Sequence, residues 1–283
     1  MGPVAVSPFE LHPLKLANLL YTLNEFSNGR ANIVIGGGGG TMIAMNLKAG
    51  RYVMHPRMVR GVRECVEFLH GVSADTPLNF DGELFRVSNY QPRWADDARP
   101  RVYVGATKPQ MLRMAASCAD GVMFSDLTEG RLDETMKILD DALQSAGRAE
   151  FHTNNLFCWH VKPDIAAAKA EARRKLWVRG MLEHWYISPV LDDDECAQVA
   201  THMPAFIKAY SEDSAVIENV PDQLVDKLID ELTFTGDHDD IDRLIGRFWH
   251  FKNAGITEMG LRLYDDPATS MRKLADVIGP ELH

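Results

Sequence analysis

Ala31-Asn-Ile-Val-Ile35 is an apolar run that ends at five glycines, Gly36, Gly37, Gly38, Gly39 and Gly40, followed by Thr41. The run is too short for a helix, and continuous apolar character is typical of a strand that is buried on both faces. Such strands belong to parallel sheets, in which helices connect successive strands. The stretch therefore predicts a strand of an α/β fold with a glycine-rich turn at its carboxyl end.

Helices and strands alternate on both sides of this strand. Apolar residues at helical spacing, with Asn28-Gly29 as a stop signal, predict a helix over residues 12–26. The same patterns predict further helices at 56–70, 110–119, 132–146, 239–254 and 268–278, and further strands at 101–105, 122–124, 151–161 and 256–263. This β/α repetition, with no linker and no fixed-period repeat, predicts one α/β domain over residues 1–283.

The predicted strands are fewer than a complete barrel needs. Five strands and a stub at residues 4–6 fall short of the eight in a closed (β/α)8 barrel, which predicts a barrel shortened by three N-terminal βα units. Residues 164–232 are mostly helical and include Trp177, Trp185 and Tyr186, so we expect a helical insertion there. Because burial of the apolar surroundings of the unpaired sheet edges is favourable, we expect a homodimer; exchange of elements between chains, or a helical insertion that covers the gap, are the alternatives.

Charge and cysteine content argue against several classes of protein. The formal net charge is −10, and no basic stripe of the kind that binds nucleic acid is present, so we expect a small-molecule substrate and no nucleic acid. Four separated cysteines without a C-x-x-C pair argue against a disulfide framework, and the ten histidines lack metal-ligand spacing. Without a membrane-spanning run or a signal-peptide pattern in residues 1–13, we expect a cytoplasmic protein with no membrane contact and no metal.

The turns after two predicted strands are candidate binding sites for a ring or a phosphate. The missing Cβ atoms of Gly36 to Gly40, next to Thr41, let backbone N–H groups approach a flat ring or an anion. A structural alternative is a tight, flexible turn. The second turn ends a strand and begins a helix, and it consists of Gly105, Ala106, Thr107 and Lys108. Unpaired N–H groups and a cation at a helix start favour the binding of phosphate. Alternatively, Lys108 is solvated and Pro109 only starts the helix.

Two further positions carry candidate functional side chains. Ser125 and Thr128 repeat the strand-to-helix arrangement one unit later and are candidate phosphate ligands, with ordinary N-caps as the alternative. His12 follows the stub and is the candidate catalytic residue, for substrate binding or proton transfer. Its place before Pro13 suits a helix start equally well. The acidic run 237–240 precedes a helix, and we interpret it as capping.

The N-terminal segment resembles the third βα unit of the luciferase-like monooxygenase superfamily. The resemblance lies in the run Gly2-Pro3-Val4-Ala5-Val6-Ser7-Pro8-Phe9, in His12-Pro13 and in residues 22–30. Further matches at 80–85, 104–112, 119–121 and 234–237 extend the resemblance over nearly the whole chain. Within the superfamily the chain is most similar to reductases of the methylenetetrahydromethanopterin reductase type, which use the deazaflavin coenzyme F420. The resemblance implies a TIM (β/α)8-type barrel of the bacterial luciferase-like class, with the cofactor at the carboxyl ends of its strands.

The resemblance also implies a cofactor and places its contacts. The cofactor would be coenzyme F420 or FMN. Members of the superfamily often have a non-prolyl cis peptide that backs the ring, which implies such a bond at Val4-Ala5. The phosphate tail would reach residues 105–108 and 125–128.

Three functions follow as hypotheses. The first is an oxidoreductase that transfers hydride between a deazaflavin or flavin and a small organic substrate, in which the protein supplies binding, orientation and electrostatics. The second is an FMN-dependent monooxygenase, in which reduced flavin reacts with oxygen. The third, from another class, is a truncated or non-catalytic flavin-binding barrel. Identification of the bound cofactor would separate the first two.

Overall fold

The computed structural model describes residues 1–38, 57–95 and 98–282 of the chain. These residues form two compact units, one made of Met1–Met123 and Lys137–Thr153, the other of Phe124–Met136 and Asn154–His283. The prediction of one domain over the whole chain stays a prediction.

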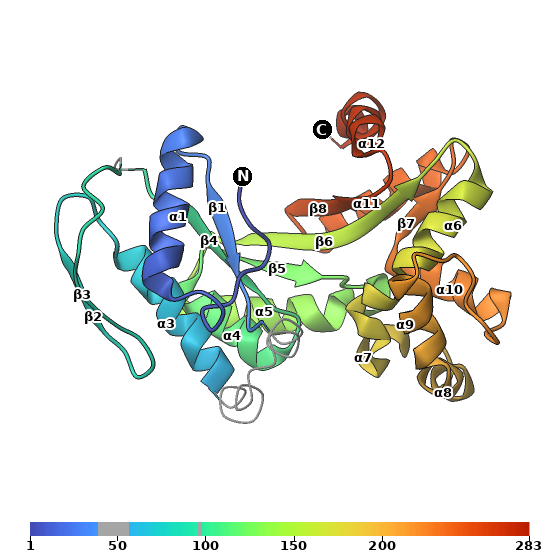
Figure 1. The fold of residues 1–283 in the computed structure, drawn as a ribbon, viewed down its shortest axis with the longest axis horizontal. Coiled ribbons are helices and arrows are strands. Elements are labelled where there is room, and N and C mark those ends of the chain that lie inside the picture. Colours follow the sequence, from blue (N-terminus) through green and yellow to red (C-terminus); the bar gives the residue numbers. More distant parts are fainter. Residues whose placement is uncertain (39–56, 96–97, 283) are drawn as a thin grey trace. The chain divides into compact units, whose positions relative to one another are not determined.

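The first unit is built around short parallel strands. β1 (Asn32–Ile35) pairs with β4 (Arg101–Gly105), and β4 pairs with the first residues of β5 (Gly121–Ser125). Figure 1 shows α1 (Pro13–Phe26) and α3 (Met58–Gly71) alongside these strands. Two further helices are α4 (Pro109–Cys118) and α5 (Leu132–Ala146), of which α5 contributes to both units.

The core of the first unit follows from the apolar pattern of its sequence. The strand residues are buried on both faces, as the continuous apolar runs predict, and the helices turn one apolar stripe inward. Almost fully buried members of this core are Leu16, Leu20, Ile33, Ile35, Val66, Val104 and Leu112. The predicted helices at 12–26, 110–119 and 132–146 and the strand at 101–105 are confirmed to within a residue or two at each end.

The stub at the N-terminus joins the edge of β1. Val6 forms a parallel bridge with Ile35, and its N–H donates to the carbonyl of Val34 at 2.8 Å. The N–H of Gly36 donates in turn to the carbonyl of Val6 at 2.9 Å. The stub therefore ends beside the carboxyl end of β1.

An antiparallel hairpin between α3 and β4 was not predicted. It consists of β2 (Leu78–Asp81) and β3 (Arg86–Tyr90), joined by a turn that begins at Gly82. The rings of Phe80 and Tyr90 both pack against Phe68 of α3, with centroids 5.7 Å away. These aromatic contacts hold the hairpin against the first unit.

The second unit has its own parallel strands. β6 (His152–Val161) pairs with β7 (Phe234–Gly236) and with β8 (Glu258–Leu263). α11 (Ile241–Asn253) packs its aromatic residues on this sheet, because Phe234 stacks on Phe248 at 4.5 Å and lies edge-on to Phe251. β7 was not predicted as a strand, whereas β6, β8 and α11 were.

Residues 164–232 are helical, as the sequence predicts. They form α6 (Ile165–Lys175), 3-10 turns at Leu176–Val178 and Gly180–Leu182, α7 (His184–Ile187), α8 (Asp193–Thr201), α9 (Met203–Ser211) and α10 (Asp222–Leu232). Leu176, Phe206 and Leu228 lie in an apolar core that these helices share. The chain ends with α12 (Pro267–Lys273), a π-turn at Leu274–Ile278 and α13 (Gly279–Glu281).

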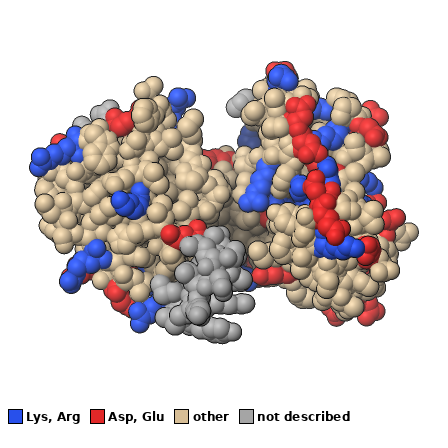
Figure 2. Space-filling view, in the orientation of Figure 1, with Lys and Arg blue, Asp and Glu red and all other residues tan. Residues whose placement is uncertain are grey.

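Charged side chains of both signs are interspersed on the face shown in Figure 2. In the second unit many of them are paired, for example Arg173 with Asp222 at 2.7 Å and Arg174 with Asp265 at 2.5 Å. Figure 2 shows acidic side chains of this unit in a continuous band with basic side chains beside it, and no basic stripe is visible among the described residues on this face. None of the described helices is long and apolar enough to cross a membrane.

Candidate functional site

Small residues meet at the carboxyl ends of the parallel segments in the first unit. Gly36 follows β1, Gly105 ends β4, and Ala5 lies in the stub that pairs with β1. A Cβ added to Gly36 would lie 3.3 Å from the Cβ of Ala5, and one added to Gly105 would lie 3.8 Å from the Cα of Gly36. The three positions are therefore direct neighbours. Because none of them carries a large side chain, a flat ligand can approach the backbone here.

The peptide bond between Val4 and Ala5 is cis. The resemblance implied a non-prolyl cis bond at this place, and the structure has it. Both residues are exposed, Val4 to 46%. The cis bond thus lies on the accessible side of the stub, next to the small residues Gly36 and Gly105.

The glycine turn after β1 is held by the stub. The hydroxyl of Ser7 donates to the carbonyl of Gly37 at 3.3 Å and accepts from the N–H of Phe9 at 3.2 Å. Gly38 has φ +74°, and a Cβ there would fall 2.5 Å from the Cβ of Ser7. Glycine is thus required at Gly38 by backbone conformation and by close packing. The predicted ligands Gly39, Gly40 and Thr41 lie outside the described residues.

His12 caps a helix. Its Nδ1 accepts a hydrogen bond from the N–H of Leu14 at 3.2 Å, and its exposed ring meets the ring of Phe85 edge-on at 5.5 Å. An Nδ1 that accepts a hydrogen bond leaves the proton of the neutral imidazole on Nε2. The helix-start interpretation of His12 is therefore confirmed, and Nε2 is the atom left to donate a proton.

Glu64 is a residue that the sequence analysis missed. It is 3% exposed, and its carboxylate accepts the backbone N–H groups of Glu83, Leu84 and Phe85 at 2.9 to 3.1 Å. The carboxylate replaces the water that these N–H groups would otherwise bind, and it fixes the tip of the hairpin. Glu64 thereby places the ring of Phe85 against His12.

The turn from Gly105 to Lys108 ends β4 and opens α4, as predicted. The N–H of Ala106 donates to the carbonyl of Met123 at 3.0 Å. Lys108 is exposed, takes the N-cap position with an extended backbone, and precedes Pro109 at the first helical position. The turn therefore places a cation at the start of a ten-residue helix.

In the second unit, the turn from Ser125 to Thr128 follows β5 and is held around Asp126. The Asp126 carboxylate accepts from Arg179 Nη1 at 2.6 Å, from the N–H of Gly180 at 3.2 Å and from the hydroxyl of Ser125 at 3.1 Å. Both side chains of the ion pair are buried, with 2% of Asp126 and none of Arg179 exposed. Burial alone would lower the pKa of Arg179. The Asp126 carboxylate outweighs this effect and holds the pKa above its usual value, so the guanidinium stays charged.

The backbone of this turn is fixed from β6 as well. The side-chain amide of Asn155 donates to the carbonyl of Leu127 at 2.9 Å and accepts a hydrogen bond from the N–H of Leu127 at 3.2 Å. The N–H of Asp126 donates to the carbonyl of Leu156. Thr128 is fully buried, yet its hydroxyl has no hydrogen-bond partner among the described residues. A rigid turn with an unpaired buried hydroxyl fits a ligand that supplies the missing acceptor or donor.

The family model for luciferase-like monooxygenases matches residues 1–258 of the chain. The chain belongs to this family. It is 24% identical over 288 residues to the 5,10-methylenetetrahydromethanopterin reductase of Archaeoglobus fulgidus, a match that covers 100% of this chain and 82% of the relative. It is 26% identical over 151 residues to an FMNH2-dependent dimethylsulfone monooxygenase of Pseudomonas fluorescens, covering 53% of this chain and 40% of the relative.

A solved structure supports the fold of this luciferase-like chain. The coenzyme F420-dependent tetrahydromethanopterin reductase of Methanopyrus kandleri superposes with a TM-score of 0.76 at 19% identity, covering 100% of this chain and 83% of the other. The predicted family, the luciferase-like α/β barrel fold class and the oxidoreductase class are thus confirmed. The relatives are named for coenzyme F420 or for reduced FMN, in agreement with the predicted cofactors.

A buried histidine and a buried carboxylate are hydrogen-bonded at the end of β6 in this luciferase-like chain. His160 Nδ1 is 2.7 Å from the Glu171 carboxylate, which also pairs with Lys162 at 2.7 Å, and the His160 ring stacks on Tyr264 at 5.3 Å. Burial lowers the pKa of His160, so its Nδ1–H donates to Glu171 as a neutral imidazole. Burial also raises the pKa of Cys158, which contacts the hydroxyl of Tyr264, to about 11. Cys158 is therefore a thiol and not a nucleophile at neutral pH.

We expect the protein to lose stability as the pH falls below about 6.5, the usual pKa of an unfolded histidine. Because the pKa of His160 is lowered in the folded state, unfolding takes up a proton there, and the free energy of unfolding falls with decreasing pH by up to about 1.4 kcal/mol per pH unit. The decrease continues until the pH reaches the folded-state pKa. Urea unfolding at a series of pH values, compared with His160→Gln, measures this; equal slopes in both proteins would contradict it.

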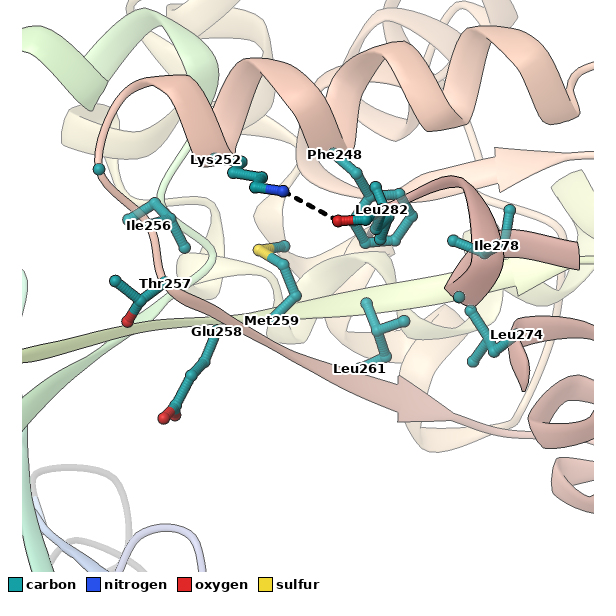
Figure 3. A pocket seen from close by; sticks show the side chains of 12 residues that line it. Phe248, Lys252, Ile256, Thr257, Glu258, Met259, Leu261, Leu274, Ile278 and Leu282 are labelled. Carbon is teal, nitrogen blue, oxygen red and sulfur yellow. Dashed lines mark hydrogen bonds between the residues drawn. The ribbon is translucent and has the colours of Figure 1, made fainter. Parts of the chain in front are cut away.

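The second unit has a cavity of about 660 Å³, and none of the residues that line it is a predicted site residue. It is lined by residues of α11, β8 and the C-terminal helices, and Figure 3 shows Met259, Leu261 and Leu274 pointing into it. Its lining is mostly apolar, and Lys252 at its rim donates to the carbonyl of Leu282 at 2.9 Å. In residues 1–38, 57–95 and 98–282, no group of three His, Cys, Asp or Glu side chains is placed to hold a metal ion.

Proposed function

We propose that the chain is an oxidoreductase that uses coenzyme F420 or a flavin to transfer hydride to or from a small organic substrate. The observation that carries this proposal is the meeting of Ala5, Gly36 and Gly105 at the carboxyl ends of parallel segments, beside the cis bond. Ligand sites of barrels lie at those ends, and the missing side chains leave room for a planar ring. The bound cofactor would supply the hydride chemistry, and the protein would bind and orient the reactants.

The proposed phosphate ligands are Ser125 and Thr128 in the second unit and residues 105–108 in the first. The buried, unpartnered hydroxyl of Thr128 supports the first set, because a phosphate oxygen would accept its proton. The exposed cation of Lys108 at the start of α4 supports the second set, because helix N-termini attract phosphate.

An FMN-dependent monooxygenase is the second candidate, supported by the FMNH2-dependent relative. Mass spectrometry of the cofactor released from purified protein, with its absorbance spectrum, separates the two functions. A deazaflavin supports hydride transfer, because carbon replaces the flavin N5, whereas FMN together with oxygen-dependent product formation supports oxygenation. Protein that binds neither cofactor when titrated with each would contradict both functions.

We propose that His12 transfers a proton to or from the substrate through Nε2. His12→Asn separates this role from helix capping, because asparagine is among the best N-cap residues but cannot titrate. The variant should keep its thermal stability and lose about 10²- to 10⁴-fold in kcat, the usual contribution of general acid–base catalysis. Steady-state kinetics with a melting curve measures both quantities. An unchanged kcat would leave His12 with capping alone.

We also propose that the chain is a homodimer and acts in the cytoplasm. Light scattering behind a size-exclusion column tests the dimer, and a monomer mass would refute it.

The cytoplasmic proposal is supported by cysteines that are all free, three of them buried, since reducing compartments keep thiols unpaired. Localisation of a tagged protein tests it.

A further inference from the structure

We infer that Arg179 is a positioning residue for the cofactor phosphate, because it neutralises Asp126 inside the turn that carries Ser125 and Thr128. The inference rests on the proposed phosphate role of those two hydroxyls. Arg179 would not need to contact the cofactor. It would act by neutralising the negative charge that repels an anion from the turn, and by fixing the conformation of the turn.

The need for such a residue follows from the charge within the turn. Asp126 lies between Ser125 and Thr128 in sequence, and the hydroxyl of Ser125 donates its proton to the Asp126 carboxylate at 3.1 Å. An unpaired carboxylate at this place would repel a phosphate, and burial would strengthen the repulsion because water could not screen it. The guanidinium of Arg179, 2.6 Å from Asp126 and fully buried, cancels that charge.

The turn needs its conformation fixed because the backbone of Asp126 is in an unfavourable region. Asp126 has φ +56°, a left-handed conformation that is unfavourable for a residue with a Cβ. Its carboxylate also accepts the N–H of Gly180, the residue after Arg179, so the side chain is tied to the segment 179–180 at two points. Arg179 in turn donates to the hydroxyl of Tyr264 at 3.4 Å.

The unpaired hydroxyl of Thr128 is an independent sign that this turn receives a ligand. The backbone on both sides of Leu127 is already satisfied by Asn155 and Leu156, so the turn is complete without Thr128. A fully buried hydroxyl without a partner is costly unless something else binds it. Phosphate, with acceptor oxygens on all sides, meets that requirement once Asp126 is neutralised.

The test compares cofactors with and without phosphate. FMN is paired with riboflavin, and F420 with its phosphate-free deazaflavin core, and affinities are measured by quenching of intrinsic tryptophan fluorescence. We define the phosphate ratio as the affinity for the phosphate-bearing member divided by that for its partner. Arg179→Met should lower the phosphate ratio at least tenfold. Asp126→Asn/Arg179→Met, which removes both charges, should return the ratio to within threefold of the wild-type value.

Asp126→Asn keeps the test decisive if Arg179→Met does not fold. This variant leaves the cation of Arg179 without its counter-charge, so the phosphate ratio should rise at least threefold. An unchanged or lower ratio in Asp126→Asn, or an equal loss of both cofactors in Arg179→Met, would overturn the inference. Wild-type protein that binds both members of each pair equally would instead overturn the proposed phosphate role of Ser125 and Thr128, and the inference with it.

Discussion

Gly36→Val should weaken cofactor binding strongly while the fold persists. The glycine lies at the carboxyl end of β1, and only the Cβ of Ala5 lies within 4 Å of an added Cβ among the described residues. Valine is well suited to the end of a strand, but the added Cβ would lie only 3.3 Å from that of Ala5, so the exposed stub must shift by a few tenths of an ångström. We therefore expect a modest loss of stability and a protein that still folds. If the ring lies over Gly36, the branched side chain overpacks the site by about 1–3 kcal/mol, which corresponds to about 5- to 150-fold in Kd. Fluorescence titration measures the affinity.

Two other glycines provide controls for this variant. Gly246 in α11 has no described atom within 4 Å of an added Cβ, so Gly246→Ala should leave Kd unchanged. Gly38→Val should lose stability as well as binding, because Gly38 has φ +74° and packs on Ser7. Circular dichroism and thermal melts distinguish the two cases. Unchanged affinity in a folded Gly36→Val protein would place the ring elsewhere.

The sequence predicted the elements that have a strong local pattern. Apolar runs such as 31–35 and amphipathic stretches such as 132–146 are decided by neighbours within a few residues, and both were placed correctly. The hairpin at 78–90 was missed although Asp81-Gly82 is a known hairpin signal, because its strands are short and mostly exposed on both faces. β7 was missed because three residues are too few to show a period.

The candidate site was predictable only where it consists of turns. Four candidate residues stand at the ends of strands or within three residues after them, so their place follows from local order: Gly36, Gly105, Ser125 and Thr128. The charged partners were not predictable, because Asp126 and Arg179 are 53 residues apart. Glu64 likewise meets the hairpin tip 19 to 21 residues later. A single sequence shows such residues as ordinary surface charges, and only their burial reveals that they must be paired.

The Asp126–Arg179 pair should also control stability. Arg179→Met leaves a buried carboxylate unpaired and should lower the free energy of unfolding by about 3–5 kcal/mol. Replacing both partners, in Asp126→Asn/Arg179→Met, removes the unpaired charge, so most of that loss should be recovered; this coupling is the signature of a buried pair. Urea unfolding of the wild type, both single variants and the double variant measures it. Because water is excluded from the pair, added salt should change the coupling little. Additive losses in the double variant would mean that the two side chains stabilise the fold independently, and the neutralising role of Arg179 would then lack its energetic basis.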